Sequence, residues 1–136
     1  MISRPVSTAA STSPVSHVIL CVDDEPAGLR ARTMVLESAG YKVIPTTSAA
    51  EALEIFTTQH IDLVLTDHLL QGTTGVEVAK QMKALHPDVP IVIFSGAVDV
   101  ALAIDKLTGS HTADMFLSKS VGPSEMLVRL AQLLKL

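Results

Sequence analysis

Four apolar runs of the sequence each end on a polar side chain that can take part in chemistry. Asp23 and Asp24 follow VILCV, Asp67 follows IDLVLT, Ser95 follows PIVIF and Lys119 follows DMFLS. Carboxylates bind hard divalent cations and can act as nucleophiles, an ammonium neutralises phosphoryl oxygens, and a hydroxyl donates a hydrogen bond to them. If the folded chain brings these side chains together, the sequence predicts a metal-dependent phosphoryl-transfer site.

The runs that carry these residues alternate with helical patterns along the chain. Ser48 and Glu51, and again Thr74 and Glu77, have the spacing of a capping box, which predicts the starts of two helices. Pro45 in the second run cannot donate a ladder hydrogen bond, so it predicts an edge strand. Strands are predicted at 18–24, 41–47, 61–67, 90–96 and 114–119, and helices at 25–40, from 48, and at 75–85, 98–107 and 122–136.

Five strand–helix units in series predict an α/β fold, a doubly wound five-stranded parallel sheet with helices on both faces. Ligands of such sheets bind beyond the carboxyl ends of the strands, so we expect the polar strand ends to gather on one rim. Three crowded carboxylates would repel one another unless a cation neutralised them. Oxygen ligands favour Mg²⁺, Mn²⁺ or Ca²⁺ over zinc, and a site with few protein ligands beside a phosphate suits Mg²⁺.

Composition limits the remaining classes of protein. The 136 residues suit one compact domain, and no apolar run reaches the length of about 18 residues that a membrane span needs. A net charge of -4 argues against general affinity for nucleic acid. The lone Cys21 lies in an apolar run, which predicts a buried thiol in a reducing cytoplasm.

We expect residues 1–16, rich in Ser, Thr, Ala and Pro, to be a flexible tail before a domain at 17–136, with no room for an appended effector domain.

These residues together resemble the receiver domains of two-component response regulators. The resemblance covers about residues 18–136 and rests on the acidic pair in CVDDE, the aspartate of LTDHLLQGTTG with a glycine eight residues on, the hydroxyl in IFSG and the lysine in FLSK. It implies a flavodoxin-like sheet with strand order 2-1-3-4-5. It also implies a cytoplasmic signalling switch, with self-phosphorylation and self-dephosphorylation as its only chemistry, and not an enzyme.

The resemblance also implies a role for each site residue. Asp67 would accept a phosphoryl group from a histidine kinase or a histidine phosphotransfer protein. Asp23 and Asp24 would hold Mg²⁺ beside it, together with Asp67 itself and the backbone carbonyl of Leu69.

Ser95 and Lys119 would contact the phosphoryl group, and Ser95 with Phe116 would form the switch pair. A static core position would explain Phe116 equally well. The signal would leave through the face of the fourth helix, fifth strand and fifth helix, towards a separate protein or a second copy of the chain. The predicted helix at 98–107 is apolar on more of its circumference than one buried face requires, which fits that surface or a better-buried helix.

The sequence departs from the family pattern at three places. Gln71 stands where the acceptor loop usually has a proline. Ser120 follows Lys119, where the family usually has a proline joined through a cis bond. A cis bond before serine would cost about 3 kcal/mol, whereas a trans bond could misplace the lysine amine. The segment between Ser95 and Lys119 is also long, with TGSHTAD before the last strand.

Several alternatives stay open. Asp23 and Asp24 could cap the first helix. His68 is expected to be an exposed loop residue, although it could gate access to Asp67 or contact a partner. The whole chain could be a receiver-like binding module that is not phosphorylated. A phosphatase of the haloacid dehalogenase type fits poorly, because that family has its second aspartate two positions after the nucleophile and VDDEP has adjacent acids.

Overall fold

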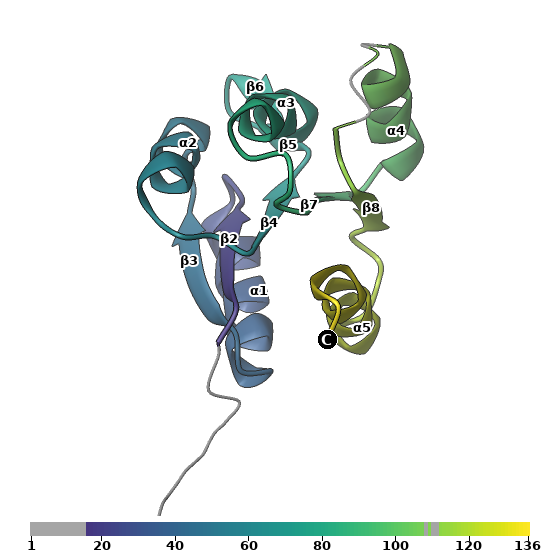
Figure 1. Cartoon of the computed structure of the whole chain (residues 1–136). Helices are drawn as coiled ribbons and strands as arrows, with labels where there is room; N and C mark the ends of the chain where they lie inside the picture. Colours follow the sequence, from purple (N-terminus) through teal and green to yellow (C-terminus); the bar gives the residue numbers. More distant parts are fainter. Residues whose placement is uncertain (1–15, 108, 110–111) are drawn as a thin grey trace, which may run out of the picture.

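The fold is a five-stranded parallel sheet between two layers of helices (Figure 1). The structure is a computed structural model that describes residues 16–107, 109 and 112–136. The strands are β2 (Val18–Val22), β3 (Lys42–Thr46), β4 (Leu63–Asp67), β7 (Ile91–Ser95) and β8 (Met115–Ser118). They lie in the order β3-β2-β4-β7-β8, and every pairing is parallel. The predicted fold class and strand order 2-1-3-4-5 are therefore confirmed.

Helices cover both faces of this sheet, as predicted. They are α1 (Pro26–Ser38), α2 (Ala49–Thr58), α3 (Gly75–Leu85), α4 (Val98–Leu107) and α5 (Pro123–Leu134). Helices α1 and α5 cover one face and α2, α3 and α4 the other (Figure 1). Alternate residues of β2 serve the two cores, since Ile19 and Cys21 pack towards α1 and α5 while Leu20 and Val22 pack towards α2 and α3.

The predicted capping positions set the starts of α2 and α3. Ser48 Oγ accepts a hydrogen bond from the backbone N–H of Glu51, and Thr74 Oγ1 accepts one from Glu77, each at 3.1 Å. The Glu51 carboxylate accepts a hydrogen bond from the hydroxyl of Thr46 at the end of β3. Helix α2 is thus tied to the neighbouring strand as well as capped.

Pro45 lies in β3, which pairs only with β2 and is therefore an edge strand as predicted. The predicted tail falls on residues 1–15, outside the described part of the chain, apart from Ser16. None of the helices in the described ranges combines the length and apolar character needed to cross a bilayer.

A short hairpin in the loop after β4 was not predicted. Strands β5 (Leu69–Leu70) and β6 (Thr73–Thr74) pair in antiparallel fashion, so Gln71 and Gly72 form the two-residue turn between them. Gly72 has φ 81°, the value of the third residue of a type II turn. The second position of that turn favours proline without requiring it, which explains why Gln71 does not prevent the turn.

Candidate functional site

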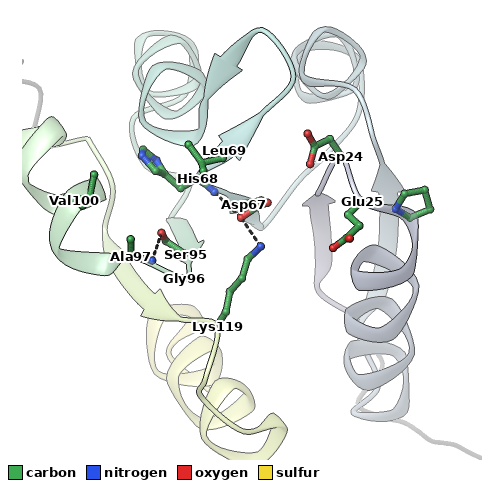
Figure 2. Close-up of a pocket in the computed structure, with 11 residues that line it drawn as sticks. Asp24, Glu25, Asp67, His68, Leu69, Ser95, Gly96, Ala97, Val100 and Lys119 are labelled. Carbon is green, nitrogen blue, oxygen red and sulfur yellow. Dashed lines mark hydrogen bonds and ion pairs between the residues drawn. The ribbon is translucent and has the colours of Figure 1, made fainter.

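The polar strand ends meet at one cavity of about 750 Å³ beyond the carboxyl edge of the sheet (Figure 2). Backbone hydrogen bonds extend the sheet to this edge: Asp23 donates to Thr46, His68 to Phe94 and Lys119 to Ser95. The lining residues are Asp24, Glu25, Pro26, Asp67, His68, Leu69, Ser95, Gly96, Ala97, Val100 and Lys119.

Three carboxylates form the acidic side of the site. One ligand oxygen from each of Asp23, Asp24 and Asp67 can be chosen so that all lie within 4.8 Å of one another. Asp23 and Asp67 are buried, whereas Asp24 is exposed. Hard oxygen donors at this spacing, with one side open to solvent, fit a divalent cation such as Mg²⁺. Asp23 Oδ1 also accepts the backbone N–H of Glu25 at 2.9 Å, but Glu25 is itself the N-cap of α1, so the alternative that the two aspartates cap this helix is wrong.

The candidate nucleophile carries both of its hydrogen-bonded contacts on one oxygen. Asp67 Oδ1 accepts the backbone N–H of His68 at 2.9 Å and lies 3.0 Å from Lys119 Nζ (Figure 2). Among the described residues, no hydrogen bond or ion pair reaches Oδ2, which leaves this oxygen for a ligand from outside the chain. The peptide bond between Lys119 and Ser120 is trans, and the amine nevertheless reaches Asp67. The absence of a proline after Lys119 does not misplace the lysine.

The two candidate switch residues lie on neighbouring strands. Ser95 is buried, and its Oγ accepts the backbone N–H of Ala97 at 2.9 Å, so the hydroxyl is turned away from Asp67 (Figure 2). Phe116 is half-buried on β8 and packs against a small cluster formed by Val76, Ile93 and Ala101. Ser95 thus lines the cavity, whereas Phe116 does not line it and packs against Ala101 of α4.

The expectation that His68 is an exposed loop residue was wrong. Its exposed fraction is 2%, because the hairpin after it folds back and Gly75 donates a hydrogen bond to the His68 carbonyl at 2.6 Å. Neither ring nitrogen has a hydrogen-bond partner among the described residues. Burial lowers the pKa of His68, and the charge of Asp67 opposes that shift in part. The ring is accordingly a neutral wall of the cavity at pH 7.

Gly75 has a steric role that the sequence did not reveal. A Cβ atom at this position would lie 2.5 Å from the backbone oxygen of Asp67 and 3.2 Å from Cα of His68. Only glycine lets the start of α3 approach the backbone of the nucleophile so closely.

Arg32 was also missed by the sequence reasoning. Its guanidinium forms an ion pair with Asp23 and lies over the ring of Phe94, 4.9 Å from the centroid. Cys21, beside it, is fully buried as predicted, and burial raises the pKa of its thiol to about 11, although Arg32 opposes the rise. Local patterns gave no signal for Arg32, because only the folded helix directs this side chain to the acidic site.

The amino-acid sequence is similar to those of known proteins over nearly the whole described chain. The family model described as "Response regulator receiver domain" matches residues 19–131. The phosphate regulon transcriptional regulatory protein PhoB of Pseudomonas aeruginosa is 31% identical over 124 residues, which cover 89% of this chain and 53% of that protein. Regulatory protein VanR of Enterococcus faecium is 32% identical over 116 residues, covering 85% and 48%. The chain thus spans about half the length of these curated relatives.

Solved structures agree with the sequence matches. A CheY-like response regulator receiver domain protein from Methanospirillum hungatei superposes with a TM-score of 0.81 at 26% identity, covering 89% of this chain and 95% of that one. Response regulator protein TrrA from Thermotoga maritima, solved in complex with Mg²⁺ and BeF, gives a TM-score of 0.78 at 26% identity, covering 86% and 98%.

Proposed function

The chain belongs to the response regulator receiver domain family, and we propose that it is a phospho-accepting switch of a two-component system. In this proposal Asp67 receives a phosphoryl group from a histidine kinase or a histidine phosphotransfer protein. The observation that carries the proposal is the Lys119 Nζ atom 3.0 Å from Asp67 Oδ1 beside a cluster of three carboxylates. Receiver domains are signalling domains, so the only chemistry proposed is gain and loss of the protein's own phosphate.

The transfer follows from the free oxygen of the nucleophile. Asp67 Oδ2 attacks the phosphorus of a phosphohistidine, and a P–O bond forms as the P–N bond breaks. The phosphohistidine reacts with its other ring nitrogen already protonated, so the bonding electrons return to the ring nitrogen that carried phosphorus and the imidazole leaves in its neutral form. Lys119 stays beside Asp67 and offsets the negative charge of the bound phosphoryl group, so that positioning and charge neutralisation carry the step.

A divalent cation belongs to the proposed site. Receiver domains bind Mg²⁺ at their acidic pocket, and here the carboxylates of Asp23, Asp24 and Asp67 and the backbone carbonyl of Leu69 would hold it. The ion would supply positive charge to the phosphoryl oxygens. Among the described residues that line the cavity, Lys119 is the one with a cationic side chain, and it lies beside Asp67 Oδ1.

The proposed switch begins at Ser95. Its hydroxyl accepts the Ala97 N–H, and to bind a phosphoryl group it must leave that partner and turn towards Asp67. Phe116 packs against Val76, Ile93 and Ala101, and its rearrangement would carry the change to the surface. Phosphorylation thus shifts an existing equilibrium between two arrangements of these residues.

The proposed output surface is the face of α4, β8 and α5. Its helices expose large apolar side chains that a protein partner would cover, namely Leu107 on α4 and Val128 on α5, with exposed fractions of 85% and 56%. We propose a downstream protein target in the cytoplasm, with a second copy of the chain as the other candidate. A net charge of -4 gives no reason to propose nucleic acid as the ligand of this domain.

The proposal is tested with a small acyl phosphate donor and intact-mass measurement, with and without MgCl₂. We expect a Mg²⁺-dependent, base-labile adduct of one phosphate on the wild type and none on Asp67→Asn. Asp114→Asn makes the same chemical change at the other end of the sheet and should label like the wild type. Labelling of Asp67→Asn, or sustained turnover of unrelated phosphate esters, would contradict the proposal.

One observation favours a second function, that of a receiver-like binding module without phosphorylation. Arg32 already neutralises Asp23, so the acidic site has an internal cation before any metal binds. A wild type that binds a partner protein but takes no label from the donor, at any Mg²⁺ concentration, would favour this function.

A further inference from the structure

Arg32 is a charged residue that the proposed phosphotransfer does not use, although it forms an ion pair with one of the three clustered carboxylates. Its side chain is 14% exposed and that of its partner Asp23 is 1% exposed, so the ion pair is nearly removed from water. A pair at such depth contributes little net stability, because desolvation of both charges offsets their attraction. A contribution to net stability therefore explains the burial of this ion pair poorly.

The surroundings hold the guanidinium in place from several sides. It contacts the face of Phe94 at 4.9 Å from the ring centroid, a favourable position for a cation. One helical turn earlier, Gly28 leaves the space that the pair occupies. A Cβ on Gly28 would lie 3.0 Å from Asp23 Oδ2 and 3.3 Å from Arg32 Nη2. Gly28 and Phe94 thus allow the Arg32 guanidinium to pack against Asp23, one of the three clustered carboxylates.

We propose that Arg32 is an internal counter-cation of the acidic site, which competes with the divalent cation for Asp23 and so weakens its binding. The inference rests on the Mg²⁺ site of the proposed function. Asp23 Oδ1 is already engaged by the Glu25 N–H and Oδ2 by Arg32. A cation that takes Asp23 as a ligand must therefore share or displace the guanidinium, and it meets a like charge when it does so. The site consequently favours Mg²⁺ only when the remaining ligands, or a phosphoryl group, add to the attraction.

The first test measures the dissociation constant of MgCl₂ by isothermal titration calorimetry, without any phosphodonor. We expect Arg32→Gln to bind Mg²⁺ at least about tenfold more tightly than the wild type, a change of roughly 1.4 kcal/mol. Arg30→Gln is the matched control, since it removes the same charge from an exposed position on the same helix and should change the constant less than about twofold. Arg32→Lys, which keeps the charge, should bind Mg²⁺ less tightly than Arg32→Gln.

A second measurement on the wild type covers the case in which Arg32→Gln does not fold. The side-chain Nε–H signal of Arg32 in a ¹H–¹⁵N spectrum should shift as MgCl₂ saturates the protein, while that of Arg129, paired with Glu125 on α5, stays in place. An unmoved Arg32 signal at saturation, or an affinity of Arg32→Gln equal to or weaker than that of the wild type, would overturn the inference. Because neither measurement involves phosphate, tighter Mg²⁺ binding by Arg32→Gln supports it even if Asp67 never labels.

Discussion

The two ends of the parallel sheet use aspartates in opposite ways. At the amino end, Asp62 Oδ2 accepts the backbone N–H of Val18 at 2.8 Å, and its Oδ1 contacts His60 Nε2 at 2.8 Å. At the carboxyl end, Asp23, Asp24 and Asp67 crowd together, with their oxygens within 4.8 Å. Asp62 thus stands apart from other acids and bonds a neighbouring strand, whereas the acids at the carboxyl end crowd together, although Asp23 and Asp67 also have partners within the chain.

Asp114 shows how complete the arrangement at the amino end is. Its Oδ2 accepts the backbone N–H of Ile91 at 2.8 Å and lies 2.7 Å from Lys83 Nζ. The same ammonium donates to the carbonyls of Pro87 and Val89, at 3.1 and 2.8 Å. An isolated acid that bonds a neighbouring strand holds that strand in register, whereas three carboxylates within 4.8 Å of one another repel unless positive charge offsets them. The crowding of the acids, and not the number of their partners, distinguishes the proposed site from the structural contacts at the amino end.

The largest effect is expected where the carboxyl end is packed most tightly. Gly75→Ala places a Cβ 2.5 Å from the Asp67 carbonyl, so the backbone of α3 or of the acceptor loop must move. We expect a loss of about 3 kcal/mol in the free energy of unfolding, measured by urea denaturation, and weaker labelling of Asp67. Gly96→Ala is the control, because no heavy atom lies within 4 Å of its added Cβ. Equal free energies of unfolding for the two variants would show that the carboxyl end of the sheet accommodates the added Cβ at position 75.

The Cys21 thiol, two positions before Asp23 on the same run, reports how far the polar region at the carboxyl end extends into the core. Burial raises the pKa of the Cys21 thiol from 9.0 to about 11, so the unfolded chain gives up this proton first as the pH rises. The stabilisation is therefore full below pH 9 and is lost as the pH approaches 11. Over that window the wild type should lose roughly 2 to 3 kcal/mol more than Cys21→Ala.

Urea denaturation at pH 8 to 11 would check the Cys21 prediction, and Tyr41, whose pKa burial also raises, cancels because both proteins contain it. If the free energy of unfolding falls equally with pH in the wild type and in Cys21→Ala, the thiol does not lie in an apolar environment. The polar region at the carboxyl end would then extend past Asp23 to Cys21.

At the amino end, removal of an acid should affect stability and nothing else. Asp114→Ala leaves the buried N–H of Ile91 without its acceptor and removes the carboxylate from Lys83, which keeps its two carbonyl acceptors, so we expect a loss of about 2 kcal/mol in the free energy of unfolding. Asp114→Asn keeps an acceptor and should lose about half as much. Phosphate labelling, measured by intact mass, should match the wild type for both variants. A labelling defect here would break the distinction between the two ends.

The sequence predicted the parts of this arrangement that local patterns encode. Apolar runs located the strands, and the spacing of Ser48 with Glu51 and of Thr74 with Glu77 located two helix starts. The rule that parallel strands present their carboxyl ends together then placed Asp67, Ser95 and the other strand ends at one rim. The roles assigned to these residues remain predictions.

Other features depend on contacts between distant segments, which local patterns do not carry. His68 looked like a loop residue, and its burial follows from the return of the chain at Gly75. Arg32 is separated from Asp23 by nine positions, and only the geometry of α1 joins them. Gln71 looked like a defect because a proline was expected, yet Gly72 supplies the positive φ that the turn needs.

The smallest expected effect on stability is also the sharpest test of the comparison. Asp24 is exposed and crowded by like charges, so Asp24→Asn should change the free energy of unfolding by less than about 0.5 kcal/mol without metal. The same substitution removes a proposed ligand, and the affinity for Mg²⁺ should fall at least about tenfold. Calorimetry and urea denaturation of Asp24→Asn and Asp114→Asn, side by side, should therefore give opposite results. If Asp24→Asn loses stability and keeps its Mg²⁺ affinity, the acids at the carboxyl end serve structure, as those at the amino end do.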